Sequence, residues 1–200
     1  AMTGLKTIVL SMPIKQKSQQ HDLSLKHQEW LVNKFDNVET HNVNLDELFS
    51  VFSSSLSKFD NEQGMANSRA RLRMTTLYQV AAANKGIVVG TGNKVEDFGV
   101  GFYTKYGDGG VDISPIADCN KTEVWEIGKE LGILNEIIEA APTDGLWDDG
   151  RTDEGQLGLE YHELEEAMDN PNSPNRDKYE TIRKQNLHKM EPIPVCKIPN

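Results

Sequence analysis

Apolar residues along the chain follow two spacings, one typical of strands and one of helices. Short apolar stretches, several rich in β-branched residues, predict strands at residues 6–10, 38–45 and 87–89. Apolar residues at helical spacing predict longer elements between and after them, at residues 22–35, 45–56, 67–84, 121–131, 134–141, 157–168 and 176–189. The pattern therefore predicts an α/β chain with parallel strands.

The stretch at residues 86–121 carries the most chemistry. Its apolar run ends abruptly on Gly90-Thr91, as a buried parallel strand does where it enters a loop. Ligands of open α/β sheets bind at such carboxyl ends. The glycine-dense loop that follows holds Lys105, Asp108 and Asp112, which suit phosphates and a divalent cation. An ordinary surface turn remains the alternative on composition alone.

Two helices carry candidate cations. Arg69 and Arg73 share a face of the helix at 67–84, where solvent exposure explains them, and Arg71 points away from that face. Lys121 falls in the first turn of a helix whose start resembles a capping box. Free backbone N–H groups favour an anion there, so a bound phosphate explains Lys121, and a solvated lysine is the alternative.

Composition limits the function classes. The 200 residues are 37% hydrophobic, which is sufficient for one globular domain at residues 1–200. No apolar run approaches the roughly 18 residues of a membrane span, and no secretion signal is present. Two cysteines without metal-ligand spacing fit the cytoplasm. A net charge of −10 argues against a nucleic-acid partner.

Residues 90–115, GTGNKVEDFGVGFYTKYGDGGVDISP, resemble ammonia-dependent NAD synthetase, a family of N-type ATP pyrophosphatases. The similarity extends to NSRARLRM at 67–74, APTDGLWDD at 141–149 and His188-Lys189. It implies a three-layer, Rossmann-like α/β fold of the adenine-nucleotide alpha-hydrolase type, with Val9, Val43 and Val88 on neighbouring strands. It also implies that ATP adenylates the carboxylate of nicotinic acid adenine dinucleotide, and that ammonia then displaces AMP to give NAD.

The resemblance implies a role for each matching residue. Thr91, Lys121 and Thr143 match contacts to ATP, and Glu96 matches a ligand of Mg²⁺. Five residues match contacts to the deamidated dinucleotide: Arg71, Lys105, Asp112, His188 and Lys189. The family also implies a homodimer through helical surface that includes residues 67–84, and a flexible segment at 144–153 that folds over the site.

One motif of the family is missing. The Ser-Gly-Gly-x-Asp-Ser phosphate loop and the strand before it are absent, and residues 1–4 resemble a helix end stopped by Gly4. We therefore expect an upstream segment in the intact protein, and residues 1–200 alone are not expected to be a competent synthetase.

Three alternatives stay open. Another amidating enzyme such as GMP synthetase is disfavoured by residues 104–110 and His188-Lys189. A degenerate nucleotide-binding module without ATP chemistry would lack the phosphate loop entirely. The synthetase domain of a glutamine-dependent NAD synthetase would also fit, but no amidase residues are recognisable, which favours ammonia as the nitrogen donor.

Overall fold

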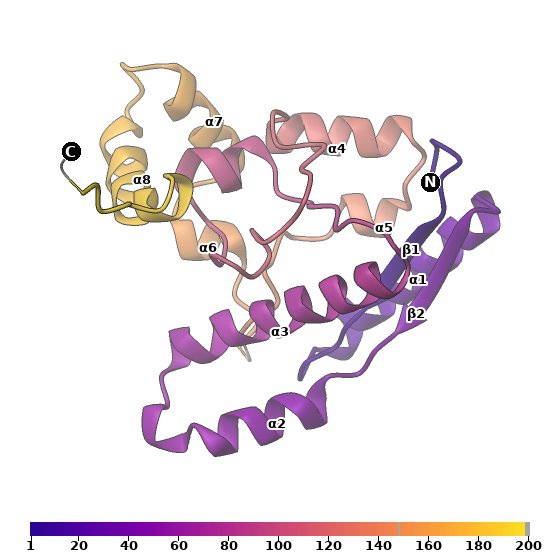
Figure 1. Ribbon diagram of the computed structural model, residues 1–200. Helices are drawn as coiled ribbons and strands as arrows, with labels where there is room; N and C mark the ends of the chain where they lie inside the picture. Colours follow the sequence, from indigo (N-terminus) through magenta and orange to yellow (C-terminus); the bar gives the residue numbers. More distant parts are fainter. Residues whose placement is uncertain (148, 199–200) are drawn as a thin grey trace.

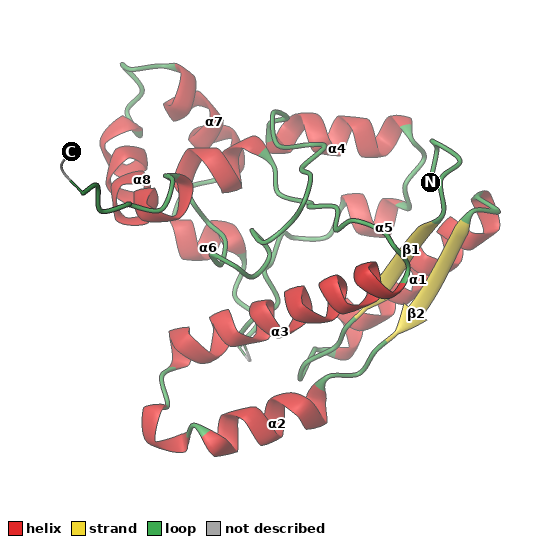
Figure 2. Ribbon diagram, viewed as in Figure 1, coloured by secondary structure: helices red, strands yellow, loops and turns green. Residues whose placement is uncertain are grey.

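The computed structural model describes residues 1–147 and 149–198, and it shows an α/β chain in which helices predominate (Figure 2). The strands are β1 (Thr7–Ser11) and β2 (Val38–Asn42). The helices are α1 (Ser18–Lys34), α2 (Asp46–Ser55), α3 (Glu62–Ala83), α4 (Lys121–Glu130), α5 (Asn135–Ile138), α6 (Asp153–Leu157), α7 (Tyr161–Asp169) and α8 (Arg176–Met190), with a short 3₁₀ turn η1 (Ser57–Phe59) and a π-helical segment η2 (Lys94–Val100). Strands and α1 lie at one end of the molecule, and α6, α7 and α8 gather at the other (Figure 1).

The sheet of the described residues has two parallel strands joined by α1. Thr7 is in register with Val38, and the pairing ends where Ser11 meets Asn42. Val43 lies just beyond β2, and its N–H is donated to the carbonyl of Ser11 at 2.8 Å. A helical crossover between parallel neighbours is the α/β unit that the sequence predicted.

Val88 is not on a neighbouring strand of this sheet, so that expectation is wrong. Its segment forms an isolated parallel bridge, Val89 to Ile113, rather than pairing with β1. The Val88 carbonyl accepts the N–H of Asp112 at 3.0 Å, so the hydrogen bonds of this segment go to the nearby returning chain. Hydrogen bonds to the returning chain thus take the place of those that a neighbouring strand of the sheet was expected to supply.

Two apolar clusters form the core. One lies between α2, α3 and the residues after β1, and includes Ile14, Leu45 and Phe49. The other joins η2, α7 and α8 through buried residues such as Val95 and Leu164, both 0% exposed. This second cluster fixes η2 in place, and η2 carries Glu96.

Local capping explains where several elements differ from expectation. α3 begins at Glu62 rather than residue 67, because the Asn61 side chain accepts the N–H of Gly64 at 2.8 Å. The helix expected at 157–168 is divided into α6 and α7 by Gly158, whose φ is +69°. Residues 1–4 form a turn that ends at Gly4, whose φ of +75° is the left-handed conformation expected of a glycine that stops a helix.

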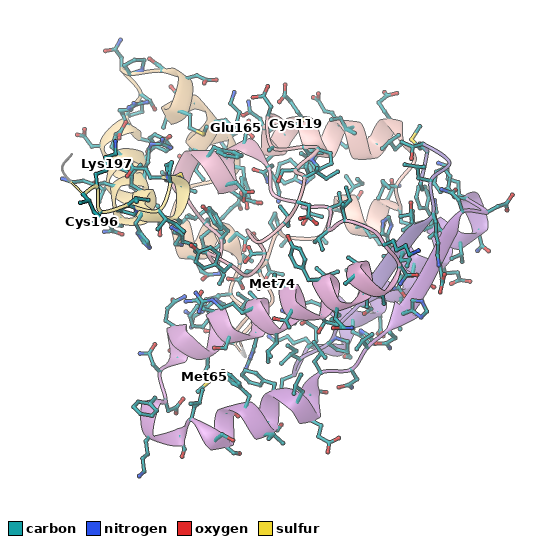
Figure 3. The ribbon with its side chains drawn as sticks, viewed as in Figure 1. Met65, Met74, Cys119, Glu165, Cys196 and Lys197 are labelled. Carbon is teal, nitrogen blue, oxygen red and sulfur yellow. The ribbon has the colours of Figure 1, made fainter. Side chains whose placement is uncertain are left out.

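Neither cysteine forms a disulfide. Cys119 precedes α4 and Cys196 lies in the C-terminal tail, well apart in Figure 3. Of the helices described, none combines the length and apolar character that a membrane crossing requires.

Candidate active site

Glu96 and Lys121 form an ion pair between η2 and the first turn of α4. The Lys121 Nζ lies 2.8 Å from Glu96 Oε1, and each side chain is only 17% exposed. The backbone of Glu96 is held as well, because its N–H is donated to the Asn93 side chain at 3.0 Å. The sequence assigned these two residues to metal and ATP separately, and the structure brings them together.

Tyr161 joins this pair from α7. Its hydroxyl is 2.6 Å from Glu96 Oε1 and 3.2 Å from Asp153 Oδ2. Tyr161 is 1% exposed, and burial together with the charges of Glu96 and Asp153 raises its pKa well above the ordinary range. The phenol therefore stays protonated and acts as a hydrogen-bond donor.

Two further carboxyls near Glu96 have raised pKa values. Burial, with the charges of Glu96 and Asp144, raises the pKa of Asp153 to about 6. Burial, with the charges of Glu96 and Asp108, raises the pKa of Asp97 to about 6 as well. A concentration of negative charge this deep in the molecule is stabilised by a cation.

The N-terminus of α4 is occupied by protein groups. The expected capping box of Asn120 and Glu123 is confirmed, with the Asn120 N–H donated to Glu123 Oε2 at 2.7 Å. Glu165 of α7 accepts the Thr122 N–H at 3.0 Å and the Thr122 hydroxyl at 2.7 Å, and it lies close to the start of α4 in Figure 3. The Glu165 carboxylate thus accepts a backbone N–H of the helix start, where the sequence predicted a bound phosphate. The Lys121 side chain contacts Glu96 instead.

Most of the residues assigned to the deamidated dinucleotide meet where α3, the glycine-rich loop and α8 come together. Arg71 donates from Nε and Nη2 to the Lys105 carbonyl, at 3.3 and 3.2 Å. Lys105 Nζ donates to the His188 carbonyl at 2.7 Å. Lys189 Nζ donates to the carbonyls of Gly101 and Tyr103 at 2.8 and 2.9 Å, and burial lowers its pKa.

Three assigned residues lie outside both groups of contacts. Asp112 accepts the Tyr78 hydroxyl at 3.1 Å and the Val88 N–H at 2.7 Å, so it braces the backbone. The Thr143 hydroxyl donates to the Arg151 carbonyl at 3.0 Å. Thr91 is exposed at the end of the isolated bridge.

The arginines of α3 face the opposite way from expectation. Arg69 is 7% exposed and donates to the Leu146 carbonyl at 2.9 Å. Arg73 donates to the Met12 carbonyl and to Gln16 Oε1, each at 3.0 Å, and burial lowers its pKa. Arg71 is the exposed one. The apolar ring of Phe49, 5.0 Å from the Arg69 guanidinium, covers the face that was expected to be exposed to solvent.

The expected covering segment at 144–153 meets this arginine face at Leu146, whose carbonyl accepts from Arg69. The Gly145 backbone lies against the Gln16 side chain, since a Cβ built there would be 2.6 Å from its Nε2. The Asp144 carboxylate accepts the Leu146 N–H and the Trp147 Nε1–H, both at 3.0 Å. Asp148, part of the same expected segment, lies outside the described residues.

The described residues offer a limited site for a metal. They contain no group of three or more His, Cys, Asp or Glu side chains placed to hold an ion. Mg²⁺ is nevertheless commonly bound by one or two carboxylates with substrate phosphates and water. Glu96 fits as one such carboxylate, with hard oxygen donors in a region of excess negative charge.

Sequence reasoning missed Tyr161 and Asp153. Tyr161 was counted as an apolar position of an amphipathic helix, and Asp153 as the end of a loop. The available signal was the tyrosine hydroxyl itself, because a phenol buried in a core requires a hydrogen-bond partner. Its partner Glu96 lies 65 residues away along the chain, so only the fold identifies it.

A family model of NAD synthase matches residues 1–198. The NH(3)-dependent NAD(+) synthetase of Carboxydothermus hydrogenoformans is 46% identical over 130 residues, which are 63% of this chain and 53% of the relative. That of Finegoldia magna is 34% identical over 187 residues, 93% of this chain and 75% of the relative. The chain spans about half the length of the first curated relatives it matches.

Solved structures agree with the sequence match. The NMN synthetase of Francisella tularensis has a TM-score of 0.87 and 31% identity, and the match covers 100% of this chain and 81% of that one. The NH3-dependent NAD synthetase of Campylobacter jejuni has a TM-score of 0.71 at 20% identity, covering 95% and 78%, and shows the fold alone. By the family model and these matches, the chain belongs to the NAD synthase family.

Proposed function

We propose that the protein amidates the nicotinate carboxylate of nicotinic acid adenine dinucleotide at the expense of ATP. A carboxylate oxygen attacks the α-phosphorus, the bond to pyrophosphate breaks, and an acyl-adenylate forms. The lone pair of ammonia then attacks the acyl carbon, AMP leaves with the bonding electrons, and the nitrogen loses a proton. A carboxylate is a poor electrophile, and adenylation converts one of its oxygens into part of a good leaving group, AMP.

The pairing of Glu96 with Lys121 is the observation that carries the proposal. Adenylation brings an anionic carboxylate to an anionic phosphate, so cations at the phosphates lower the barrier. Lys121 supplies one such cation, with Thr91 and Thr143 as further contacts to ATP. Glu96 would hold Mg²⁺, which would neutralise charge at the phosphate oxygens. The chain itself binds and orients the two anions.

The basic groups between α3 and α8 are assigned to the other substrate. The guanidinium of Arg71 is exposed, and a planar two-pronged donor suits a phosphate. Lys105 and Lys189 lie beside it through the backbone contacts described above, and His188 and Asp112 complete the proposed contacts to the dinucleotide. In this structure the ammonium groups of Lys105 and Lys189 donate hydrogen bonds to backbone carbonyls of the chain. A phosphate oxygen of the substrate can replace those carbonyls as the acceptor.

A second candidate substrate is the mononucleotide of nicotinic acid. The match to the Francisella tularensis NMN synthetase favours it, because that structure aligns with the whole chain at a TM-score of 0.87. The two substrates share the nicotinate ring with its carboxylate, the ribose attached to that ring and the 5′-phosphate of that ribose. Both call for the same chemistry at Glu96 and Lys121, and they differ in what the remaining basic groups contact.

The test is a comparison of both nucleotides with the full-length protein, ATP and Mg²⁺. Ammonium and glutamine are supplied in separate reactions, and mass spectrometry identifies the amidated product and AMP. We expect the dinucleotide to react with ammonium at the higher kcat/KM. Amidation of the mononucleotide alone would replace the first candidate with the second, and the absence of any amidated product would refute both.

A further inference from the structure

Tyr161 contacts both members of the Glu96–Lys121 pair with different parts of its side chain. Its hydroxyl lies 2.6 Å from Glu96 Oε1, and the Lys121 ammonium lies 4.8 Å from the centre of its ring. The Lys121 Nζ and the Tyr161 hydroxyl converge on the same oxygen of Glu96. One buried tyrosine thus fixes the carboxylate and provides a face for the ammonium.

Packing holds Tyr161 in one position. It is 1% exposed within the cluster that includes Val95 and Leu164, and Trp125 of α4 packs edge-to-face on its ring with centroids 6.0 Å apart. It is also the first residue of α7, so its backbone belongs to a capped helix. A side chain this enclosed cannot follow a ligand, in contrast to the longer lysine beside it.

The single proton of the phenol is directed towards Glu96. The hydroxyl also lies near Asp153, but at 3.2 Å, against 2.6 Å to Glu96. Asp153 is 6% exposed, and its other oxygen, Oδ1, has no hydrogen-bond partner within the described structure. The shorter contact is the stronger one, so Glu96 is the main acceptor of the phenol proton.

We propose that Tyr161 is a positioning residue that holds the Glu96 carboxylate in place when Lys121 leaves it for the phosphates of ATP. The inference rests on the proposed function, in which Lys121 and Glu96 serve ATP and Mg²⁺ respectively. Departure of Lys121 removes one of two donors to Glu96 Oε1. Tyr161 is the donor that stays, and its hydrogen bond keeps the Glu96 carboxylate oriented so that it can bind a cation.

Tyr161→Phe tests this role, because it removes the hydroxyl and keeps the ring under Lys121 and the packing of the core. Tyr179→Phe is the matched control. Tyr179 is 5% exposed in the same cluster, and among the described residues its hydroxyl donates to the Gly99 carbonyl alone, at 3.4 Å. Both variants lose one buried hydroxyl, and only Tyr161 touches Glu96.

The first measurement is Mn²⁺ binding in the presence of ATP and the absence of the second substrate, followed by electron paramagnetic resonance with the full-length protein. We expect the Kd for Mn²⁺ to rise about tenfold in Tyr161→Phe, as is typical when a group that orients a metal ligand is lost. We expect it to be unchanged in Tyr179→Phe. Equal Mn²⁺ affinity in wild type and Tyr161→Phe would overturn the proposal, as would a wild type that binds no Mn²⁺ with ATP.

The second measurement separates this role from the reaction itself. Under the proposed function, the Mg²⁺ concentration for half-maximal NAD formation rises in Tyr161→Phe, and the KM for the nicotinate nucleotide stays the same. A raised KM with an unchanged Mg²⁺ requirement would overturn the positioning role and leave the amidation intact. A wild type that binds Mn²⁺ with ATP but amidates neither nucleotide would refute the proposed function, and the Mn²⁺ comparison would still decide the role of Tyr161.

Discussion

Lys121 Nζ lies 2.8 Å from Glu96 Oε1, so the cation assigned to ATP is neutralised by the carboxylate assigned to Mg²⁺. With both side chains 17% exposed, neither charge is well solvated, and each depends on the other for stabilisation. ATP with Mg²⁺ offers each a replacement partner of the correct sign. Under the proposed function, we therefore expect ATP and Mg²⁺ to replace each of these two side chains as the other's partner.

Glu96→Gln should lower ATP-dependent NAD formation by roughly 100-fold, because the amide keeps the size of the side chain but removes its charge. Affinity for the dinucleotide without ATP should change little, since other residues hold it. Turnover across a Mg²⁺ titration and equilibrium binding of the dinucleotide measure the two effects. Glu136→Gln is the control, as it breaks a Lys–Glu pair of 2.7 Å that is exposed and joins α1 to α5. Normal turnover of Glu96→Gln at limiting Mg²⁺ would remove Glu96 from the metal site.

Lys189→Met should weaken binding of the nicotinate nucleotide about tenfold, the effect of losing hydrogen bonds to a charged group. The methionine keeps the apolar stem but releases the carbonyls of Gly101 and Tyr103. Calorimetric titration without ATP measures the change. Lys184→Met, an exposed lysine of the same helix, should bind as wild type does. Equal affinity in both variants would show that Lys189 only supports the loop.

Asp153 should make stability depend on pH. Its pKa rises from 3.8 to about 6 on folding, so the folded state holds this proton more tightly. The stabilisation is fully present below pH 3.8 and is lost as the pH rises through 6. Relative to Asp153→Asn, the wild type should lose about 3 kcal/mol at most across this range. Urea unfolding at several pH values measures it, with the exposed Asp118→Asn as control; parallel curves for wild type and Asp153→Asn would contradict the prediction.

Gly101→Ala should destabilise the fold by about 3 kcal/mol, for two separable reasons. The φ of Gly101 is +67°, and a Cβ there would lie 2.6 Å from the Asn186 Cβ of α8. Gly4→Ala isolates the first reason, because its φ is +75° with no atom within 4 Å of the added carbon. That control should lose about 1 kcal/mol in urea unfolding. Equal losses would mean that α8 moves away without cost.

The protein should form a homodimer through helical surface that includes α3. Near α3, on α2 and η1, the apolar side chains of Leu48, Val51 and Phe59 are 51%, 61% and 78% exposed, and apolar side chains left open to solvent are candidates for an interface between subunits. Sedimentation at micromolar concentration should show a dimer, and Val51→Asp should shift it towards the monomer. A monomeric wild type would contradict the assembly, and an unaffected variant would exclude this patch from the interface.

Local signals predicted much of the fold. The capping box at Asn120, the last helix and the start of α2 all depend on residues within a turn of each other, and the structure places them within one or two residues of expectation. The sheet position of Val88 depended on which distant segment would pair with it, and the pattern does not contain that information. The same limit applies to the arginines of α3. Helical spacing places Arg69 and Arg73 on one face, but it does not indicate which other part of the chain that face contacts.

The candidate site shows the same difference between what local sequence signals predict and what only the fold reveals. Resemblance assigned Glu96 and Lys121 individually, but their contact required the fold to bring η2 and the first turn of α4 together, and both elements pack on α7. Tyr161 and Asp153 carry no motif, and their importance comes from lying in the core next to a charge. Asp112 matched the family position, yet in this structure its carboxylate braces the Val88 backbone.

The Glu165 carboxylate at the start of α4 affects how strongly phosphate capture at this end would depend on the surrounding solution. A helix N-terminus binds an anion through N–H groups fixed in direction, but Glu165 already occupies the Thr122 N–H. The side-chain cation that would meet an incoming phosphate at this end is the Lys121 ammonium, a compact charge on a flexible stem that imposes little geometry. While a nucleotide approaches through solvent, attraction of that kind is weakened by dissolved salt, which screens it over about 8 Å at physiological ionic strength. Nucleotide capture at this end should therefore vary with the ionic strength of the surrounding solution, as it would not if rigid backbone donors held the phosphate.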